Sequence, residues 1–419
     1  MIEEEIPMPS YVFENARVLD GSSDDGEYDR HVRVSEGMID EVSDKPIKDV
    51  NAIMIDLKGK TLMPGLIDCH VHVYSAAEDP SASSRMPNEL VALHAAKIVK
   101  GMLLRGFTTV RDVGGATLGF KYALESGLID GPRLTMCGKA FVQSGGHTDP
   151  RERGDLISAE TFNNQLGNVS KIVDGVDECR RAAREEIRKG AQFIKVMAGG
   201  GAAQLRMPRS WNAYSMDELR AFQEEAENAK TYVCVHAHSD ESIARALACG
   251  IKSIEHCTLI TPATAAIMAE KGAYSTPTIS AYEGQIIEAE RLGLDAAAVE
   301  RLQWVRDRGP VSLEIMHNAG VKICHGSDHL GFLHPHQNLE FNIRAEALPP
   351  IEVIRSTTIN AAELCLMAGK IGTIAAGAYA DMIVIDGDPL KDISLLGDEG
   401  KSFQAIMKGG VFYKNELSH

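Results

Sequence analysis

Short apolar segments alternate with longer amphipathic segments along most of the chain. Eight of the short segments are almost continuously apolar, which is typical of strands buried on both faces. They span residues 66–73, 106–114, 132–140, 191–199, 231–238, 252–260, 273–280 and 321–328. Helices are predicted between them, in stretches such as NELVALHAAKIVKGMLLR, and several of these stretches start at a Ser, Asp or Thr and stop at a Gly. The pattern therefore predicts eight consecutive β/α units.

The two ends of the chain have a different pattern, in which short alternating segments are broken by Gly, Asp and Lys. Stretches such as HVRVSEGMIDEVS near the start and FQAIMKGGVFYKNEL near the end predict short strands with tight turns. The simplest interpretation pairs residues 1–62 with residues 370–419 in one small β-sandwich domain that brackets residues 63–369. Eight β/α units in about 300 residues fit a (β/α)8 TIM barrel. The predicted fold class is α/β, a TIM barrel with a small β-sandwich domain.

A doubly wound open sheet is the alternative architecture for alternating strands and helices. It would carry a Gly-rich phosphate-binding loop directly after its first strand. The first predicted strand here runs into Asp68-Cys-His70-Val-His72 instead. The position that would bind a phosphate is therefore occupied by two imidazoles, and the barrel is favoured.

Composition and charge narrow the choice of partners and compartment. The chain has 59 acidic and 43 basic residues, a formal charge of −16, and so acidic a surface repels nucleic acids and lacks a polybasic membrane anchor. No stretch approaches the ~18 apolar residues needed to cross a bilayer, and the acidic N-terminus does not resemble a signal peptide. The eight cysteines form no CxxC motif and are predicted to be buried in a reducing compartment. We expect a cytoplasmic protein with neither a nucleic-acid nor a membrane partner.

Ionisable side chains gather at the predicted carboxyl ends of the strands, where a barrel carries its active site. Any one buried His is more simply explained as a hydrogen-bonded core residue, whereas a Lys within an apolar strand is rare because an ammonium is costly to bury. The strand ends of a closed barrel converge on one axis, so the coincidence predicts a shared metal site. The residues are His70 and His72 on the first strand, Lys195 on the fourth, His236 and His238 on the fifth, His256 on the sixth and Asp328 on the eighth.

The lysine changes the expected number of metal ions. Imidazole and carboxylate ligands suit Zn²⁺, and also Mn²⁺, Co²⁺, Fe²⁺ or Ni²⁺. A protonated Lys195 would repel a cation. A buried lysine with a lowered pKa can react with CO2 to give a carbamate, an anion whose two oxygens can bridge two metals. Lys195 therefore predicts two divalent ions joined by an N6-carboxylated lysine.

Several motifs together resemble those of the amidohydrolase superfamily, and the resemblance covers essentially the whole chain. They are PGLIDCHVHV, the strand-four lysine, the later HAH, IEH and GSD motifs, and TINAAELCLMAGKIGTIAAGAYADMIVID near the end. Within the superfamily, GFTTVRDVGG, SGGHTDPR, IKVMAGGG and SIEHCTLI are most similar to prolidase-like carboxypeptidases and ochratoxin-hydrolysing amidases. Members of that branch cleave an amide whose amine side is an L-amino acid with a free carboxylate.

The resemblance implies a division of the ligands between two divalent metal ions, with Zn²⁺ the expected ion. Carboxylated Lys195 would bridge both metals, and relatives with a single metal lack such a lysine. Two metals ~3.5–4 Å apart can hold a bridging hydroxide at neutral pH, which would be the nucleophile. Asp328 would take the proton of the water and deliver it to the departing amine. The implied ligands are His70, His72 and Asp328 for the more buried ion and His236 and His256 for the second.

Four further residues are candidates for binding the substrate. The resemblance implies that His147, in a Gly-rich loop after the third strand, contacts the scissile carbonyl or the substrate carboxylate. His238 stands where prolidase-like members carry a Tyr, which makes it more similar to the ochratoxin-type amidases. Arg151 and Arg153 follow in the same loop as His147 and could pair with a carboxylate, although loop arginines are more often solvated.

Two further segments are weaker candidates for contact with the substrate. Trp211 and Tyr214, after the fourth strand, could line an aromatic or aliphatic pocket. His334 and His336 follow the eighth strand, where a loop that faces the substrate is favoured over a third metal site.

The favoured function is metal-dependent hydrolysis of N-acyl L-amino acids that carry a free carboxylate. The substrate would be a small amide or dipeptide, cleaved by an Xaa-Pro or Xaa-Xaa dipeptidase, a carboxypeptidase or an aryl-amide amidase acting on L-Phe. A cyclic-amide, lactone or urea hydrolase is the alternative enzyme. A catalytically inactive barrel that serves in assembly is disfavoured because all six predicted ligands are present. Relatives of this type are commonly homo-oligomers, so a homo-oligomer is expected.

Overall fold

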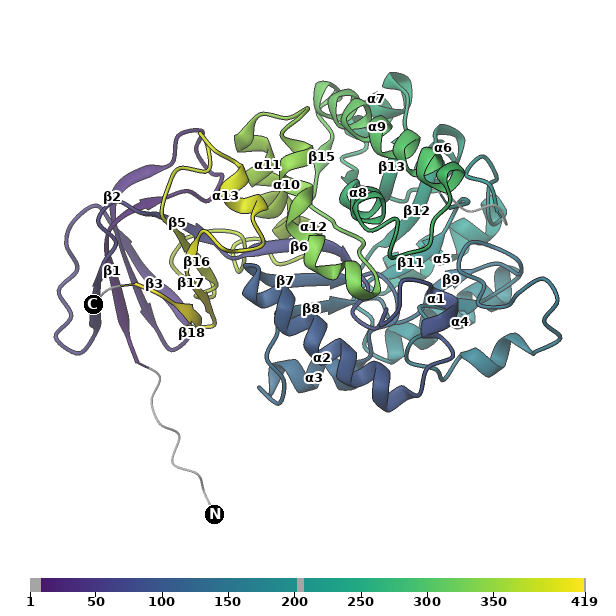
Figure 1. Ribbon diagram of the computed structural model, residues 1–419, viewed down its shortest axis with the longest axis horizontal. Coiled ribbons are helices and arrows are strands. Elements are labelled where there is room, and N and C mark those ends of the chain that lie inside the picture. Colours follow the sequence, from purple (N-terminus) through teal and green to yellow (C-terminus); the bar gives the residue numbers. More distant parts are fainter. Residues whose placement is uncertain (1–8, 202–206, 418–419) are drawn as a thin grey trace, which may run out of the picture.

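The computed structural model describes residues 9–201 and 207–417. Segments from both ends of the chain share one mixed sheet at one end of the molecule (Figure 1). Its order is β18-β17-β16-β5-β1-β2-β3, and β4 pairs with β1. These strands are β1 (Tyr11–Val18), β2 (Glu27–Ser35), β3 (Met38–Ser43), β4 (Ile53–Asp56), β5 (Thr61–Pro64), β16 (Met382–Ile385), β17 (Phe403–Lys408) and β18 (Val411–Asn415).

The rest of the strands pair in parallel, and each of the eight predicted strand segments contains one of them. They form a three-stranded sheet, β6-β7-β8, and a seven-stranded sheet, β10-β9-β11-β12-β13-β14-β15. The strands are β6 (Leu66–Val71), β7 (Phe107–Asp112), β8 (Arg133–Met136), β9 (Ala140–Val142), β10 (Ser170–Ile172), β11 (Ile194–Met197), β12 (Val233–Ser239), β13 (Ser253–Leu259), β14 (Tyr274–Thr276) and β15 (Lys322–Ile323).

The parallel strands form two sheets, where the sequence predicted one closed barrel. The eighth strand, β15, is two residues long. Beyond it the chain runs beside the first strand. Two backbone hydrogen bonds still join these segments: Cys69 N donates to His325 O at 2.8 Å, and Asp328 N donates to His70 O at 2.9 Å. The first and eighth strands are therefore neighbours, as they would be in a closed barrel.

Helices separate the strands along the chain and lie outside the parallel strands (Figure 1). The longest ends at Gly320, whose φ of 79° gives the left-handed cap that a side chain would strain. Among the residues described, none of the helices combines the length and the apolar character that crossing a bilayer requires. The helices are α1 (Pro80–Ser83), α2 (Asn88–Leu104), α3 (Leu118–Glu125), η1 (Ala159–Phe162), α4 (Val176–Arg188), α5 (Met216–Asn228), α6 (Asp240–Ala248), α7 (Pro262–Glu270), α8 (Ser280–Ile287), α9 (Ala296–Ala319), η2 (Gly331–Asn338), α10 (Leu339–Arg344), α11 (Pro350–Thr357), α12 (Ile359–Leu364) and α13 (Ser394–Gly397).

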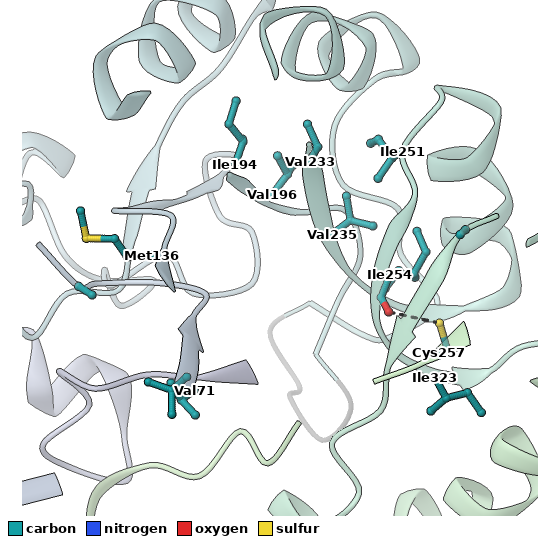
Figure 2. Close-up of a cluster of buried hydrophobic side chains, with 14 of the residues drawn as sticks. Val71, Met136, Ile194, Val196, Val233, Val235, Ile251, Ile254, Cys257 and Ile323 are labelled. Atoms are coloured by element: carbon teal, nitrogen blue, oxygen red, sulfur yellow. Dashed lines mark hydrogen bonds between the residues drawn. The ribbon is translucent and has the colours of Figure 1, made fainter. Parts of the chain in front are cut away.

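Alternation along the central strands separates core residues from site residues. Successive side chains of a strand point to opposite faces. The apolar positions of β11, β12 and β13 pack into the main hydrophobic core, and the intervening positions carry the polar candidates. Figure 2 shows part of this core, with Ile194, Val196, Val233, Val235 and Ile254 among the labelled side chains. The eight cysteines are free and buried, which confirms their predicted place in the core.

Candidate metal centre

The predicted histidines converge with Asp328 at the ends of the parallel strands. His70 Nε2 and His72 Nε2 each lie 3.4 Å from Asp328 Oδ1. Ligand atoms of His70, His256 and Asp328 lie within 4.8 Å of one another, and so do those of His236, His238 and His256. His256 belongs to both groups, so the two candidate metal sites are contiguous.

Regular alternation along β13 would place His256 on the face opposite to its neighbour Glu255, which contacts His70 Nδ1 from behind the centre. His256 has a φ of 73° and Asp328 a φ of 54°, both in the left-handed region that non-glycine residues seldom adopt. The departure from regular strand geometry lets two adjacent residues, Glu255 and His256, reach the same centre. Strain of this kind is concentrated at functional sites.

Hydrogen bonds fix the orientation of two of the imidazoles. His72 Nδ1 lies 3.0 Å from Gly114 O, and His256 Nδ1 lies 2.8 Å from Thr278 Oγ1. Each contact occupies Nδ1 and leaves Nε2 as the ligand atom, as is usual for metal-binding histidines. His256 Nε2 is buried and has no hydrogen-bond partner among the described residues, which fits a position reserved for a cation.

The two histidines of β12 differ in orientation. His236 Nε2 lies 3.2 Å from Gly200 O, which leaves Nδ1 as its ligand atom. His238 Nδ1 lies 2.9 Å from Thr258 Oγ1, which leaves Nε2 directed away from that hydroxyl. His147, from the loop after β9, packs beside His236 with ring centroids 4.3 Å apart. The loop histidine and the strand histidines therefore share one site.

Lys195 is buried beside these groups, with 1% of its surface exposed. Its Nζ has no hydrogen-bond partner in the part of the chain that the structure describes. An ammonium buried without a partner is strongly destabilised. The lack of a partner for Lys195 Nζ, near several imidazoles and a carboxylate, therefore fits a side chain whose partners would be bound metal ions.

The charges of the site suit metal ligation. The pKa of His72 is lowered to about 4 and that of His238 to about 3, mainly by burial. Both rings are therefore neutral at pH 7. Burial opposes the ionisation of Asp328, but the neighbouring His70 and His72 outweigh it and hold the pKa of this carboxyl well below its ordinary value. Burial also lowers the pKa of His70, but Asp328 and Glu255 outweigh it and raise that pKa.

A buried ion pair behind the metal centre was missed by sequence reasoning. Glu255 Oε2 lies 2.7 Å from His70 Nδ1, and Arg111 Nη2 lies 2.8 and 2.9 Å from the two oxygens of Glu255. Burial raises the pKa of Glu255, but the charge of Arg111 outweighs burial and lowers this pKa to about 2. The signal was available as an arginine inside the apolar strand GFTTVRDVGG. Arg111 and Glu255 together hold the His70 ring so that Nε2 faces Asp328.

Replacing this arginine is expected to lower stability strongly. Arg111→Met leaves Glu255 as an uncompensated buried charge, which costs ~3–5 kcal/mol of unfolding free energy. The folded pKa of Glu255, about 2, lies below its ordinary value of 4.5, so this stabilisation is present above pH 4.5 and is lost as the pH falls toward 2. Urea unfolding at pH 7 measures the change.

Arg184→Met is a matched control for Arg111→Met. Arg184 also pairs with a glutamate, Glu225, but its side chain is 65% exposed. Exposed ion pairs contribute little to stability. Equal effects of the two substitutions would contradict a stabilising role of the buried pair.

The candidate ligands open into a cavity of about 540 Å³. His70, His72, His236, His238, His256 and Asp328 line it, together with His147. The rest of the lining comes from loops and helices that follow the strands, and much of it is apolar. A cavity of this size accommodates a small organic molecule.

The other predicted substrate-binding residues lie away from the described lining of this cavity. Arg151 forms an ion pair with Asp149 in its own loop, at 2.8 Å, and Arg153 is exposed. Tyr214 is buried and its hydroxyl donates to Val173 O, so it is part of the core rather than of a pocket wall. Trp211 is exposed, with 58% of its surface accessible.

The segment after β15 faces the cavity, which agrees with the expectation of a loop near the substrate. Leu330, Phe332 and Leu333 are among the lining residues. His336 Nε2 lies 3.1 Å from Glu288 Oε1, but within the described residues no group of three suitable ligands includes His334 or His336. The alternative of a third metal site there finds no support.

Comparison with known proteins agrees with the resemblance of the motifs. The model of the amidohydrolase family matches residues 61–411. Ochratoxinase of Aspergillus niger is 30% identical over 388 residues, which cover 89% of this chain and 79% of that protein.

Solved structures extend the similarity to the whole fold. The crystal structure of an amidohydrolase is 45% identical with a TM-score of 0.94, covering 98% of this chain and all of that one. A prolidase in complex with N-methylphosphonate-L-proline is 43% identical with a TM-score of 0.93, covering 97% of this chain and all of that one. By the extent of the match and by its ochratoxinase and prolidase relatives, the chain belongs to the amidohydrolase family.

Proposed function

We propose that this hydrolase of amide bonds cleaves N-acyl L-amino acids, dipeptides included, that carry a free carboxylate. The observation that carries the proposal is the convergence of four histidines and an aspartate around a buried lysine whose Nζ has no partner among the described residues. In this proposal Lys195 would be N6-carboxylated and would help to hold two divalent ions, with Zn²⁺ the expected ion. The other ligands are His70, His72 and Asp328 for one ion and His236 and His256 for the other.

The bound metals would supply an acidified water and polarise the scissile carbonyl. Asp328 would accept the proton of the attacking water and pass it to the departing amine. Its carboxyl is ionised before the reaction because the neighbouring histidines lower its pKa. Glu255 and Thr278 hold the rings of His70 and His256 in place, so the centre needs little rearrangement during the reaction.

His147 and His238 are the proposed contacts for the carboxylate or the carbonyl of the substrate. Both line the cavity beside the metal ligands, and the His238 ring centroid lies 4.6 Å from that of His256. The prolidase relative binds a derivative of L-proline, which supports an L-amino acid on the amine side. The ochratoxinase relative supports the alternative of an amidase of the ochratoxin type.

The proposal includes a closed (β/α)8 barrel in residues 63–369 and a β-sandwich domain from residues 1–62 and 370–419. The two backbone hydrogen bonds between the first and eighth strands support closure. The shared sheet of β1–β5 with β16–β18 supports the second domain. We also propose a cytoplasmic location, which the eight free cysteines support, and a homo-oligomer, which rests on the resemblance to the family alone.

Comparing an N-acyl amino acid with its C-terminal amide tests the substrate class. The acid is expected to have a kcat/KM ~10–150-fold higher than the amide, because a lost charge-assisted contact leaves a buried partner unpaired. His147→Ala and His238→Ala are each expected to reduce this ratio. His94→Ala, an exposed histidine on α2, is the matched control. Arg151→Gln and Arg153→Gln test the two loop arginines in the same assay.

Equal kcat/KM values for the acid and the amide would contradict the proposed substrate class. A cyclic-amide, lactone or urea hydrolase would then be the better description. Screening the metal-loaded protein against those three classes of substrate would distinguish them.

A further inference from the structure

The lining of the cavity includes a metal-binding part and an apolar part, besides polar residues such as Glu78, Asp79 and Gln285. The metal-binding part lies at the strand ends. The apolar part comes from segments beyond the strands: α8, the link between α8 and α9, α9 itself and the turn η2. It therefore surrounds whatever extends outward from the metal centre. Its main residues are Tyr282, Leu292, Leu294, Leu302, Phe332 and Leu333. We refer to these six residues as the apolar wall.

One cation stands in this wall. Arg291 is the only Arg or Lys among the described residues that line the cavity. Its guanidinium carbon lies 3.5 Å from the centroid of the Phe332 ring, so the planar cation stacks on that ring. The side chain remains 60% exposed and is part of the cavity lining, so the guanidinium is not enclosed by protein.

Contacts at its edge keep Arg291 in this position. Glu288 Oε2 lies 3.9 Å from Arg291 Nη1, and the other oxygen of Glu288 lies 3.1 Å from His336 Nε2. Glu288 does not line the cavity as described, so it contacts the guanidinium from outside. Arg291 and Phe332 thus form a layered platform whose open face is a planar cation.

We propose that the apolar wall and the Arg291 platform bind the acyl group of the substrate and select a flat aromatic one. The inference rests on the proposed function and narrows its substrate class. Apolar area gains free energy on burial in such a wall, whereas a polar acyl group loses its hydration there. An aromatic ring gains further binding free energy by stacking on the guanidinium, and a saturated ring with the same number of carbons cannot stack in this way.

The test compares N-phenylacetyl-L-phenylalanine with N-cyclohexylacetyl-L-phenylalanine on the metal-loaded protein. The two substrates share the amine and the methylene beside the carbonyl, so the reactivity of the scissile bond is closely matched. The phenylacetyl substrate is expected to have a kcat/KM roughly 3- to 10-fold higher. Arg291→Met keeps an apolar stem but removes the planar cation, and it is expected to bring the ratio close to one.

Two further variants separate stacking from apolar burial. Leu294→Asn is expected to lower kcat/KM for both substrates by a similar factor, because it makes the wall polar without removing the platform. Ile287→Ala is the matched control: Ile287 is 54% exposed at the end of α8 and lies outside the described lining. It is expected to change neither substrate.

Binding of the two free acids keeps the inference testable without turnover. Phenylacetate is expected to bind the metal-loaded protein more tightly than cyclohexylacetate, and Arg291→Met is expected to remove the difference. Equal affinities, or a preference that survives Arg291→Met, would overturn the inference. Failure to cleave any N-acyl amino acid, with the binding preference intact, would instead overturn the proposed function alone.

Discussion

Removing divalent ions from the purified protein with a strong chelator is expected to abolish amide hydrolysis, and returning Zn²⁺ is expected to restore it. The expectation follows from the convergence of four imidazoles and an ionised Asp328. Metal analysis is expected to find about two ions per chain before chelation. The melting temperature should fall as well, because ions that bind only the folded state stabilise it. A metal-free preparation with full activity would refute the assignment of the centre.

The Lys195→Ala substitution tests the same metal centre by removing one proposed ligand. It is expected to reduce metal content and activity together, and short carboxylic acids are expected to restore part of both by replacing the carbamate. Lys139 offers a control, since it is half-buried and its Nζ donates to Gln165 O at 2.8 Å. Lys139→Ala is expected to leave the metal content per folded chain unchanged. An unmodified Lys195 in fully active protein would contradict the bridging role.

The order of strands and the identity of the candidate ligands could be predicted because both follow from local patterns. Alternation on β12 sends Val233 and Val235 into the core and His236 and His238 to the other face, and this is visible in the sequence. Parallel strands must bring their carboxyl ends to one edge. The convergence of residues far apart in the chain, such as His70 and Asp328, follows from that rule.

Contacts made by loops and by partners distant in the sequence could not be predicted. Nothing in SGGHTDPR shows that Arg151 pairs with Asp149 within its own loop. Nothing local shows that Arg111 supports His70 through Glu255, because three different strands meet there. The short strands β9 and β10 were also missed, since three residues are too few to give a periodic signal.

The apolar wall was missed for a related reason. The sequence predicted an aromatic or aliphatic pocket in the segment that holds Trp211 and Tyr214, whereas four of the six wall residues are leucines, two of them in the link between α8 and α9. A leucine in a link has no periodic context, so its sequence does not distinguish a cavity wall from an ordinary buried position. Only the folded chain shows which leucines face the cavity.

Asp328→Asn is expected to retain metal and lose most turnover. Asn offers an oxygen in nearly the same position, and it tolerates the left-handed φ of 54° that this position requires, so the substitution changes the chemistry with little change of the backbone. An amide cannot accept the proton of the attacking water, and the loss of a general base typically lowers kcat by ~10²- to 10⁴-fold. Measuring kcat together with metal content separates this effect from loss of a ligand. A variant with a normal metal content and nearly normal kcat would show that another group moves the proton, and His238, which lies beside His256 and faces the same cavity, would be the next residue to replace.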